Sequence, residues 1–364
     1  MLPSASALVA SRVSWVAVPH IGTEHEIYHT AEVPVQKTLA YYRDAFMFDM
    51  RRYLKGDQDM LKSFQYHMRN FNKNCGVINY ITNYYGFTLN DLVSYETKHN
   101  EPNGEGNADG MNQNYSWNCG AEGPSRKKHI KQLRHKQMKN ALSFLFTAQG
   151  TPLLFAGDEF GNSQDGNNNC YCQDNDTGWV DWNNMAKNTD VFEYAKELIS
   201  FRKKHPMLHL DTALTMLDKY KCGYPDLSYH GEEAWKAQLS SYNRHIGIMY
   251  CGLGSSEEGD RIYIAYNMHW EQHRFALPSI ADYEWDCVLG TEENVVVYDE
   301  EKNTSYIDIE PRSISILVGK LLPKIEKKPK GTKQQRTVNS PTGEKLMSGK
   351  QTKTPRTNLK AAEG

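Results

Sequence analysis

Two adjacent carboxylates, Asp158 and Glu159, directly follow the short apolar run TPLLFAG. A pair of acids at the end of a strand can share the work of proton transfer, because one carboxyl donates a proton while the other accepts one. The pair is therefore a first candidate for general acid–base chemistry. It opens a polar segment, 158–182, that is rich in asparagine, aspartate and glycine.

A second polar segment, 99–123, has a similar composition, and both segments carry aromatic residues. Amide and carboxylate groups offer donors and acceptors that match sugar hydroxyls, and an aromatic face can stack on a pyranose ring. The alternative is structural, because loops rich in Asn and Asp satisfy their own backbone and tryptophans pin such loops down. The candidate sugar-binding residues are Asn114, Tyr115, Trp117, Asn118, Asp158, Glu159, Asn168, Asn169, Tyr171, Asp174 and Trp179.

Strands and helices are expected to alternate around these loops. The run VINYITNYYG, 77–86, is β-branched and aromatic and ends at a glycine, which predicts a buried strand. Residues 132–149 carry apolar side chains at helical spacing before a glycine, TPLLFAG predicts a second strand, and residues 191–204 predict a second helix. This order is typical of a parallel α/β barrel, whose functional loops lie at the carboxyl ends of the strands.

The pattern changes beyond about residue 207. Segments 261–270, 295–298, 306–309 and 313–318 are short runs of strand-forming residues bounded by Gly, Asn and Pro. Several short strands at such spacing predict an antiparallel sandwich.

From about residue 42 to residue 320 the chain resembles the C-terminal half of the glycogen-debranching, isoamylase and pullulanase branch of the α-amylase superfamily. The resemblance rests on FTLNDLVSYETKHNEPNGEG with NQNYSWNCGAEG, on GTPLLFAGDEFGNSQDGNNNCYCQDNDTGWVDW, and on LSYHGEEAW with AYNMHW. It implies about the last four β/α units of a (β/α)8 TIM barrel, with the sixth strand near residues 38–45, followed by an all-β domain. We therefore expect an α/β fold with a partial barrel over 1–206, a β-sandwich over 207–322 and a disordered basic tail over 323–364.

The resemblance also implies where the catalytic groups should stand. Retaining glycosidases need a carboxylate nucleophile and a second carboxyl that acts as acid and then base. In the family these follow the fourth and fifth barrel strands, and a His-Asp pair follows the seventh; the Gly-Asp-Glu of residues 157–159 lies outside this set. Tyr84 and Tyr85 stand in place of the His-Asp pair, and if VAVPHIG is the fifth strand end, Val18 occupies the acid/base position.

A phenol with an ordinary pKa of about 10 is neutral near pH 7 and does not replace a carboxylate. No residue can be assigned as nucleophile, since its strand would precede the first residue. Tyr84 and Tyr85 have two interpretations, either as aromatics that fill the former substrate pocket or as a stacking platform.

Half a barrel leaves two unpaired strand edges and an uncovered apolar layer. We therefore expect a truncated product, one half of a barrel completed by a second polypeptide, or self-association.

The 364 residues carry a net charge of −2, which is unevenly distributed. The tail 323–364 has 11 Lys or Arg against 3 Glu, so the other residues hold 31 basic and 41 acidic groups. An acidic folded part argues against nucleic acid as its partner. No apolar run reaches the roughly 18 residues of a membrane span, and the N-terminal segment lacks the pattern of a signal peptide, so a cytoplasmic protein is expected.

Seven scattered cysteines predict reduced thiols rather than a disulfide framework. Cys170 and Cys172 lack the second ligand pair typical of zinc sites, so neither a metal nor another cofactor is expected. Two functions remain. The first is a non-catalytic α-glucan-binding relative of debranching enzymes, and the alternative is an active α-1,6 debrancher whose missing acids come from another polypeptide.

Overall fold

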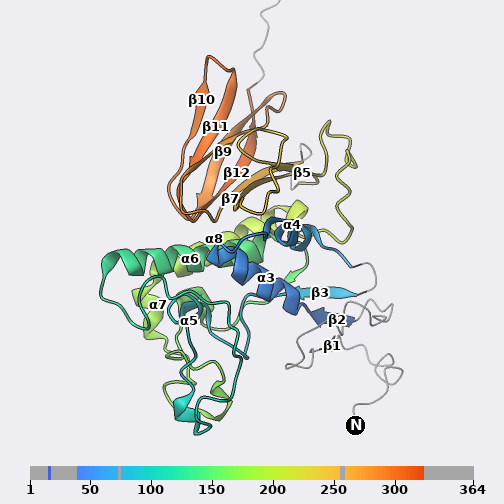
Figure 1. The fold of residues 1–364 in the computed structure, drawn as a ribbon. Coiled ribbons are helices and arrows are strands. Elements are labelled where there is room, and N and C mark those ends of the chain that lie inside the picture. Colours follow the sequence, from blue (N-terminus) through green and yellow to red (C-terminus); the bar gives the residue numbers. More distant parts are fainter. Residues whose placement is uncertain (1–14, 18–38, 73–74, 255–258, 324–364) are drawn as a thin grey trace, which may run out of the picture. The chain divides into compact units, whose positions relative to one another are not determined.

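The computed structural model describes residues 15–17, 39–72, 75–254 and 259–323 (Figure 1). Val18 and nearly all of the tail predicted to be disordered lie outside the described residues. Contacts between Cα positions separate the chain between Leu322 and Pro323.

Four parallel strands form the first sheet. They are β1 (Trp15–Ala17), β2 (Leu39–Tyr42), β3 (Gly76–Asn79) and β4 (Thr151–Pro152), and they lie side by side in chain order. Parallel neighbours require a crossover connection, which helices supply between β2 and β3 and between β3 and β4 (Figure 1). The predicted parallel sheet and the strand expected near residues 38–45 are confirmed.

The strands themselves are shorter than expected. The one predicted over 77–86 ends at Asn79, and the run TPLLFAG contributes only Thr151 and Pro152. Pro152 has no N–H to donate to the sheet, which weakens that edge. The assignment of these strands to about the last four β/α units of a (β/α)8 barrel stays a prediction.

The helices of this part are α3 (Asp44–Lys55), α4 (Leu61–Arg69), α5 (Leu89–Leu92), α6 (Lys128–Thr147), α7 (Asn183–Lys187) and α8 (Thr189–Lys204). The helices predicted over 132–149 and 191–204 are confirmed as α6 and α8, whereas α3 and α4 were not foreseen. α3 ends at Gly56, whose left-handed φ of 89° lets its N–H and that of Asp57 reach the carbonyl of Arg52. In the described residues no helix has the length and apolarity needed to cross a bilayer.

Two antiparallel sheets follow, as predicted. The larger sheet has the strand order β5 (Leu227–His230), β6 (His245–Gly252), β7 (Asp260–Asn267), β12 (Ser313–Leu321) and β9 (Tyr283–Gly290). The smaller sheet has the order β10 (Val296–Asp299), β11 (Thr304–Ile309) and β8 (His273–Ala276).

β6 and β7 are buried on both faces, and their side chains alternate between two apolar clusters. Ile248 and Ile264 belong to the cluster shared with the helices, whereas Met249 and Tyr263 belong to the cluster shared with β8 and β11. Because successive side chains of a strand point to opposite faces, the larger sheet packs against the helices on one face and against the smaller sheet on the other. The core therefore continues across residue 206, and the domain boundaries of the sequence analysis stay a prediction.

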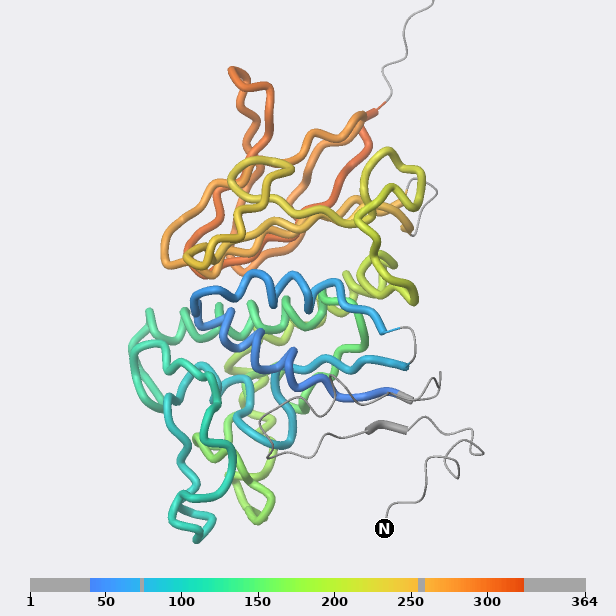
Figure 2. Tube along the Cα trace, turned by 45° about the vertical axis from the view of Figure 1, so that its right-hand side comes forward, coloured from blue at the N-terminus to red at the C-terminus, as the bar shows by residue number. Residues whose placement is uncertain are grey.

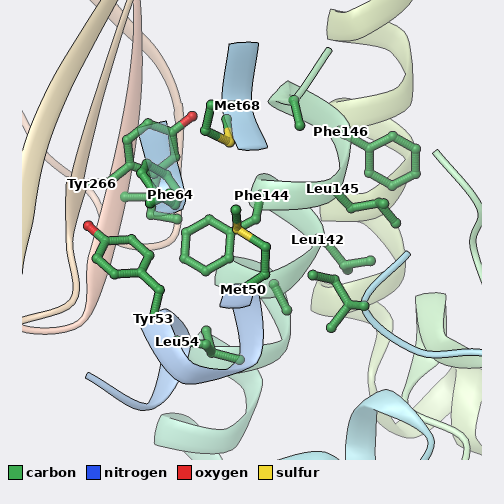
Figure 3. Close-up of a cluster of buried hydrophobic side chains, with 14 of the residues drawn as sticks. Met50, Tyr53, Leu54, Phe64, Met68, Leu142, Phe144, Leu145, Phe146 and Tyr266 are labelled. Carbon is green, nitrogen blue, oxygen red and sulfur yellow. The ribbon is translucent and has the colours of Figure 1, made fainter. Parts of the chain in front are cut away.

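An aromatic group lies at the centre of the helix-side cluster (Figure 3). The centre of the Phe64 ring on α4 lies 4.3 Å from the ring centre of Tyr53, 5.4 Å from that of Phe144 and 4.9 Å from that of Tyr266 on β7. The buried hydroxyl of Tyr53 donates to the carbonyl of Arg244 at 3.0 Å. These contacts tie α3, α4 and α6 to the larger sheet.

Replacing Phe64 by Ala should lower the free energy of unfolding by about 3–5 kcal/mol, because the ring is 1 % exposed and its removal leaves a cavity. Tyr66 on the same helix is 48 % exposed and is the matched control, for which Tyr66→Ala should cost about 1 kcal/mol or less. Urea unfolding followed by fluorescence measures both values. Equal losses would show that Phe64 is not part of the core; Phe64→Leu gives an intermediate value if the alanine variant is unfolded.

The turn at Gly56 gives a second test. A Cβ there would lie 3.2 Å from the carbonyl oxygen of Met268, which follows β7. A side chain at this position would therefore be destabilised both by the positive φ and by this close contact. Gly104 has a similar φ of 79° with open space around it. We expect Gly104→Ala to cost about 1–2 kcal/mol from φ alone and Gly56→Ala to cost clearly more. Indistinguishable melting temperatures for the two variants would contradict the close contact.

Candidate functional site

The turn that follows β3 holds the two tyrosines that replace the expected His-Asp pair. The Tyr85 N–H donates to the side-chain oxygen of Asn83 at 2.9 Å, and the Gly86 N–H donates to the carbonyl of Asn168 at 2.9 Å. Gly86 has a φ of 111°, which a side chain would strain. Tyr84 is 61 % exposed, so its ring does not fill a pocket.

Asp158 reaches this turn from the loop after β4. It is buried at the start of the short 3-10 helix η2 (Asp158–Phe160), where one carboxylate oxygen accepts from the Leu89 N–H at 2.8 Å and the other accepts from the Thr82 hydroxyl. Burial raises the pKa of Asp158 to about 7, against the opposing effect of these hydrogen bonds and of the Arg51 guanidinium. The neighbouring Glu159 turns away and accepts from the Gly157 N–H at 2.9 Å. The acidic pair is therefore split between two environments.

Arg51 is a buried charge that the sequence analysis missed. Its side chain comes from α3 and is 1 % exposed; Nε donates to the carbonyl of Ile81 at 2.8 Å, and one Nη donates to the carbonyl of Asn114 at 3.1 Å. The other Nη has no hydrogen-bond partner in the described part of the chain. Burial lowers the pKa of Arg51 to about 10. Its spacing of four residues from Met47 and three from Leu54 is the signal that would have placed it inward.

The loops 99–123 and 158–182 run side by side (Figure 2), and asparagine side chains bond across them. The amide nitrogen of Asn100 donates to the side-chain oxygen of Asn168 at 2.8 Å. The amide nitrogen of Asn168 in turn donates to the side-chain oxygen of Asn114 at 2.9 Å. All three side chains are at most 3 % exposed. Their amides are therefore bonded to each other rather than presented to solvent.

A second set of amides continues this connection next to η1 (Glu101–Asn103). Asn167 donates to the side-chain oxygen of Asn103 at 2.8 Å, and Asn103 and Asn169 both donate to the same carboxylate oxygen of Asp109, at 2.7 and 2.9 Å. Asn118 stands apart, because its amide donates to Glu122 at 3.1 Å and its oxygen accepts from the Gly120 N–H. The structural alternative thus describes Asn114, Asn118, Asn168 and Asn169.

The aromatic candidates fall into two groups. Tyr115 and Trp117 are partly buried: the Tyr115 ring meets Phe48 edge-on at 5.6 Å, and the Arg312 guanidinium lies 4.4 Å from the centre of the Trp117 ring. Both line a small cavity of about 10 Å³ beside Arg51, which is far below the roughly 300 Å³ at which ligand pockets begin.

Tyr171 and Trp179 form the exposed group. Tyr171, in η3 (Cys170–Cys172), is 78 % exposed and Trp179 is 55 % exposed. The Trp179 indole N–H donates to Asp174 at 3.0 Å, so Asp174 fixes the ring by its edge and leaves its faces available for stacking. Tyr171, Trp179 and Tyr84 are thus the candidate aromatics whose rings are more than half exposed.

Comparisons with known proteins were made at the levels of sequence and structure. No family model matches the chain. It is 52 % identical over 128 residues to a glycogen operon protein GlgX homolog of Mycobacterium tuberculosis, covering 35 % of this chain and 18 % of that protein. It is 34 % identical over 252 residues to the chloroplastic isoamylase 3 of Oryza sativa subsp. japonica, covering 67 % of this chain and 30 % of the relative.

Among solved structures, a pullulanase from an Anoxybacillus species in complex with maltotetraose aligns with a TM-score of 0.52 and 17 % identity. The alignment covers 77 % of this chain and 35 % of the pullulanase. The chain thus spans less than a third of the length of the two curated relatives and matches only one segment of them. It belongs, as a partial-length match, to the GlgX, isoamylase and pullulanase branch of the α-amylase family.

Proposed function

We propose that this chain binds α-glucan without hydrolysing it. The single observation that carries the proposal is the turn after β3, which bears Tyr84 and Tyr85 at the positions where the family resemblance leads us to expect an ionised His-Asp pair. A related pullulanase was solved with maltotetraose, which supports a glucan as the ligand. Without a carboxylate facing the anomeric carbon, the oxocarbenium-like transition state has no charge partner.

The buried acid closest to this turn is unsuited to replace the lost groups. Both oxygens of Asp158 accept hydrogen bonds from within the protein, and its raised pKa keeps it substantially protonated near neutrality. A nucleophilic carboxylate has to be ionised and open to the sugar. Asp158 therefore serves as a clamp between the β3 turn and the start of α5.

The glucan-contacting surface is assigned to Tyr171, Trp179 and Tyr84 rather than to the asparagines. Flat exposed aromatics suit the apolar faces of pyranose rings, and each is more than half exposed. Asp174 contributes by orienting the Trp179 indole.

A second candidate function is an active α-1,6 debrancher in which another polypeptide supplies the acids. The observation that favours it is the parallel sheet, which we take as the last four units of a (β/α)8 barrel. Within the described residues neither β1 nor β4 has a second neighbouring strand, and parallel sheets are normally covered on all sides. A second copy of the chain would cover these edges without restoring the acids.

The purified chain should release no reducing sugar from glycogen or pullulan, yet a native gel that contains glycogen should retard it relative to a gel without glycogen. The missing acids abolish hydrolysis, while the aromatic surface keeps binding. Clear hydrolysis by the chain alone would refute the proposal of an inactive chain, and equal mobility in both gels would refute glucan binding.

The retardation should depend on the exposed aromatics. The double variant Tyr171→Ala, Trp179→Ala should weaken glycogen affinity by about 10-fold, equivalent to about 1.4 kcal/mol. Tyr298→Ala on β10 removes a ring of comparable exposure, 57 %, and is the control expected to bind normally. Equal weakening by the control variant would assign binding to another surface.

Asp158 makes the stability of the chain depend on pH. Its folded pKa of about 7 exceeds the ordinary value near 4, so its contribution is complete below about pH 4 and is lost as the pH rises through about 7. Asp158→Asn imitates the protonated carboxyl at every pH. Between about pH 5 and 7 its free energy of unfolding should therefore fall less steeply than that of the unmodified chain, by on the order of 1 kcal/mol per pH unit. Urea unfolding across this range measures the slopes.

The control for this experiment is Asp176→Asn, which changes an exposed carboxylate in the same loop. Its profile should parallel that of the unmodified chain. If the Asp158 variant shows the same slope as this control, the clamp carboxyl is ionised throughout and the argument against its catalytic use loses its support.

A further inference from the structure

Two histidines and a glutamate from separate segments of the antiparallel sheets converge on one point. Glu232 follows β5, His245 begins β6 and His273 begins β8, and one ligand atom from each lies within 4.8 Å of the other two. The Nδ1 of His273 lies 3.0 Å from the Glu232 carboxylate, and the Nε2 of His245 lies 3.9 Å from the same oxygen. The two imidazole rings stack with their centres 3.9 Å apart.

His245 is the unusual member of this group. Its side chain is 5 % exposed, and neither ring nitrogen has a hydrogen-bond partner in the described residues. The Phe275 ring packs edge-on against it at 5.6 Å, so one wall is apolar. A buried polar group without a partner destabilises the folded chain, and such a group calls for a ligand or ion that satisfies it.

We propose that Glu232, His245 and His273 bind a divalent transition-metal ion of the zinc class. Two imidazoles and one carboxylate are ligands that Zn²⁺ accepts, at about 2.0–2.2 Å each. Such bonds in tetrahedral geometry place ligand atoms roughly 3.3–3.5 Å apart, close to the 3.0 and 3.9 Å found here. Glu232 is half exposed, so its side chain can turn to close the remaining gap, and water completes the fourth position.

A second group, His269, Glu271 and His273, has similar spacing but is the poorer site. Burial is the main cause that lowers the pKa of His269, and the guanidiniums of Arg244 and Arg312 lower it further. A cation bound there would therefore lie near two positive charges. The neighbouring groups that shift the pKa of His245 are His273, Glu232 and His269, and none of them is an arginine.

The metal would act as a structural link. β5 and β6 belong to the larger sheet and β8 to the smaller one, and the Ala276 N–H already donates to the carbonyl of Glu232 at 3.2 Å. A metal held by all three residues ties the two sheets together at this edge. The proposal departs from the expectation of no metal, because ligands separated by 12 and 27 intervening residues have no recognisable sequence spacing.

The test uses the full chain with any affinity tag removed and with metal stripped by a chelator. Calorimetric titration with ZnCl2 should give one ion per chain, and Co²⁺ should give the visible absorption of a tetrahedral complex. Glu232→Gln and His273→Gln should each lower the Zn²⁺ affinity by at least about 10-fold, since even a lost outer-shell partner costs 10–100-fold. His209→Gln replaces an exposed histidine and is the control expected to bind Zn²⁺ unchanged.

The outcome separates the proposal from adventitious binding. Zn²⁺ should also raise the melting temperature of the unmodified chain and of the His209 variant, but not that of the Glu232 or His273 variants. Circular dichroism confirms that each variant is folded, and the exposed position of Glu232 keeps that variant informative. Absence of stoichiometric binding, or affinities that are the same in all four proteins, would overturn the proposal.

Discussion

The buried carboxyl of Asp158 is the interaction on which the loop region depends. Its oxygens accept hydrogen bonds from the Thr82 hydroxyl in the turn after β3 and from the Leu89 N–H at the start of α5. The loop after β4, the β3 turn and α5 therefore meet at one side chain. Removing a carboxyl from water is costly unless hydrogen bonds replace the lost solvation. The polar groups that could have served catalysis at a strand end are thereby used to hold the strand end in place.

The same principle explains the asparagines. An amide that can bind a sugar hydroxyl can equally bind another amide, and burial decides between the two. Asn100, Asn114 and Asn168 are inside the interface of the two loops, where water cannot compete, so they bond to each other. Sequence composition identified the polar loops correctly but could not assign their amides, because residues 100 and 168 become neighbours only through the fold.

The parts of the fold that were predicted are those with strong local signals. Residues 132–149 and 191–204 have apolar residues at helical spacing and clear stops, and both are helices in the structure. The sequence analysis does not predict α3 and α4, because the polar residues Arg51 and His67 lie on their buried faces and interrupt the apolar pattern. The strand predicted after residue 76 is too long because Tyr84 and Tyr85 resemble strand residues. In the structure a local bond from the Tyr85 N–H to Asn83, together with the bond from the Gly86 N–H to the distant Asn168, holds this segment in a turn.

The larger antiparallel sheet limits how the chain can be completed. Both faces of β6 and β7 are already covered, one by helices and one by the smaller sheet, so neither strand presents an apolar face to a partner. In the parallel sheet, β1 and β4 each pair on one side only within the described residues, as the outer strands of the two antiparallel sheets also do. A partner strand gains hydrogen bonds only where ladder groups are unpaired. A strand that extends the parallel sheet would therefore join next to β1 or β4, on the sheet whose strands lead into the tyrosine turn and the clamped Asp158.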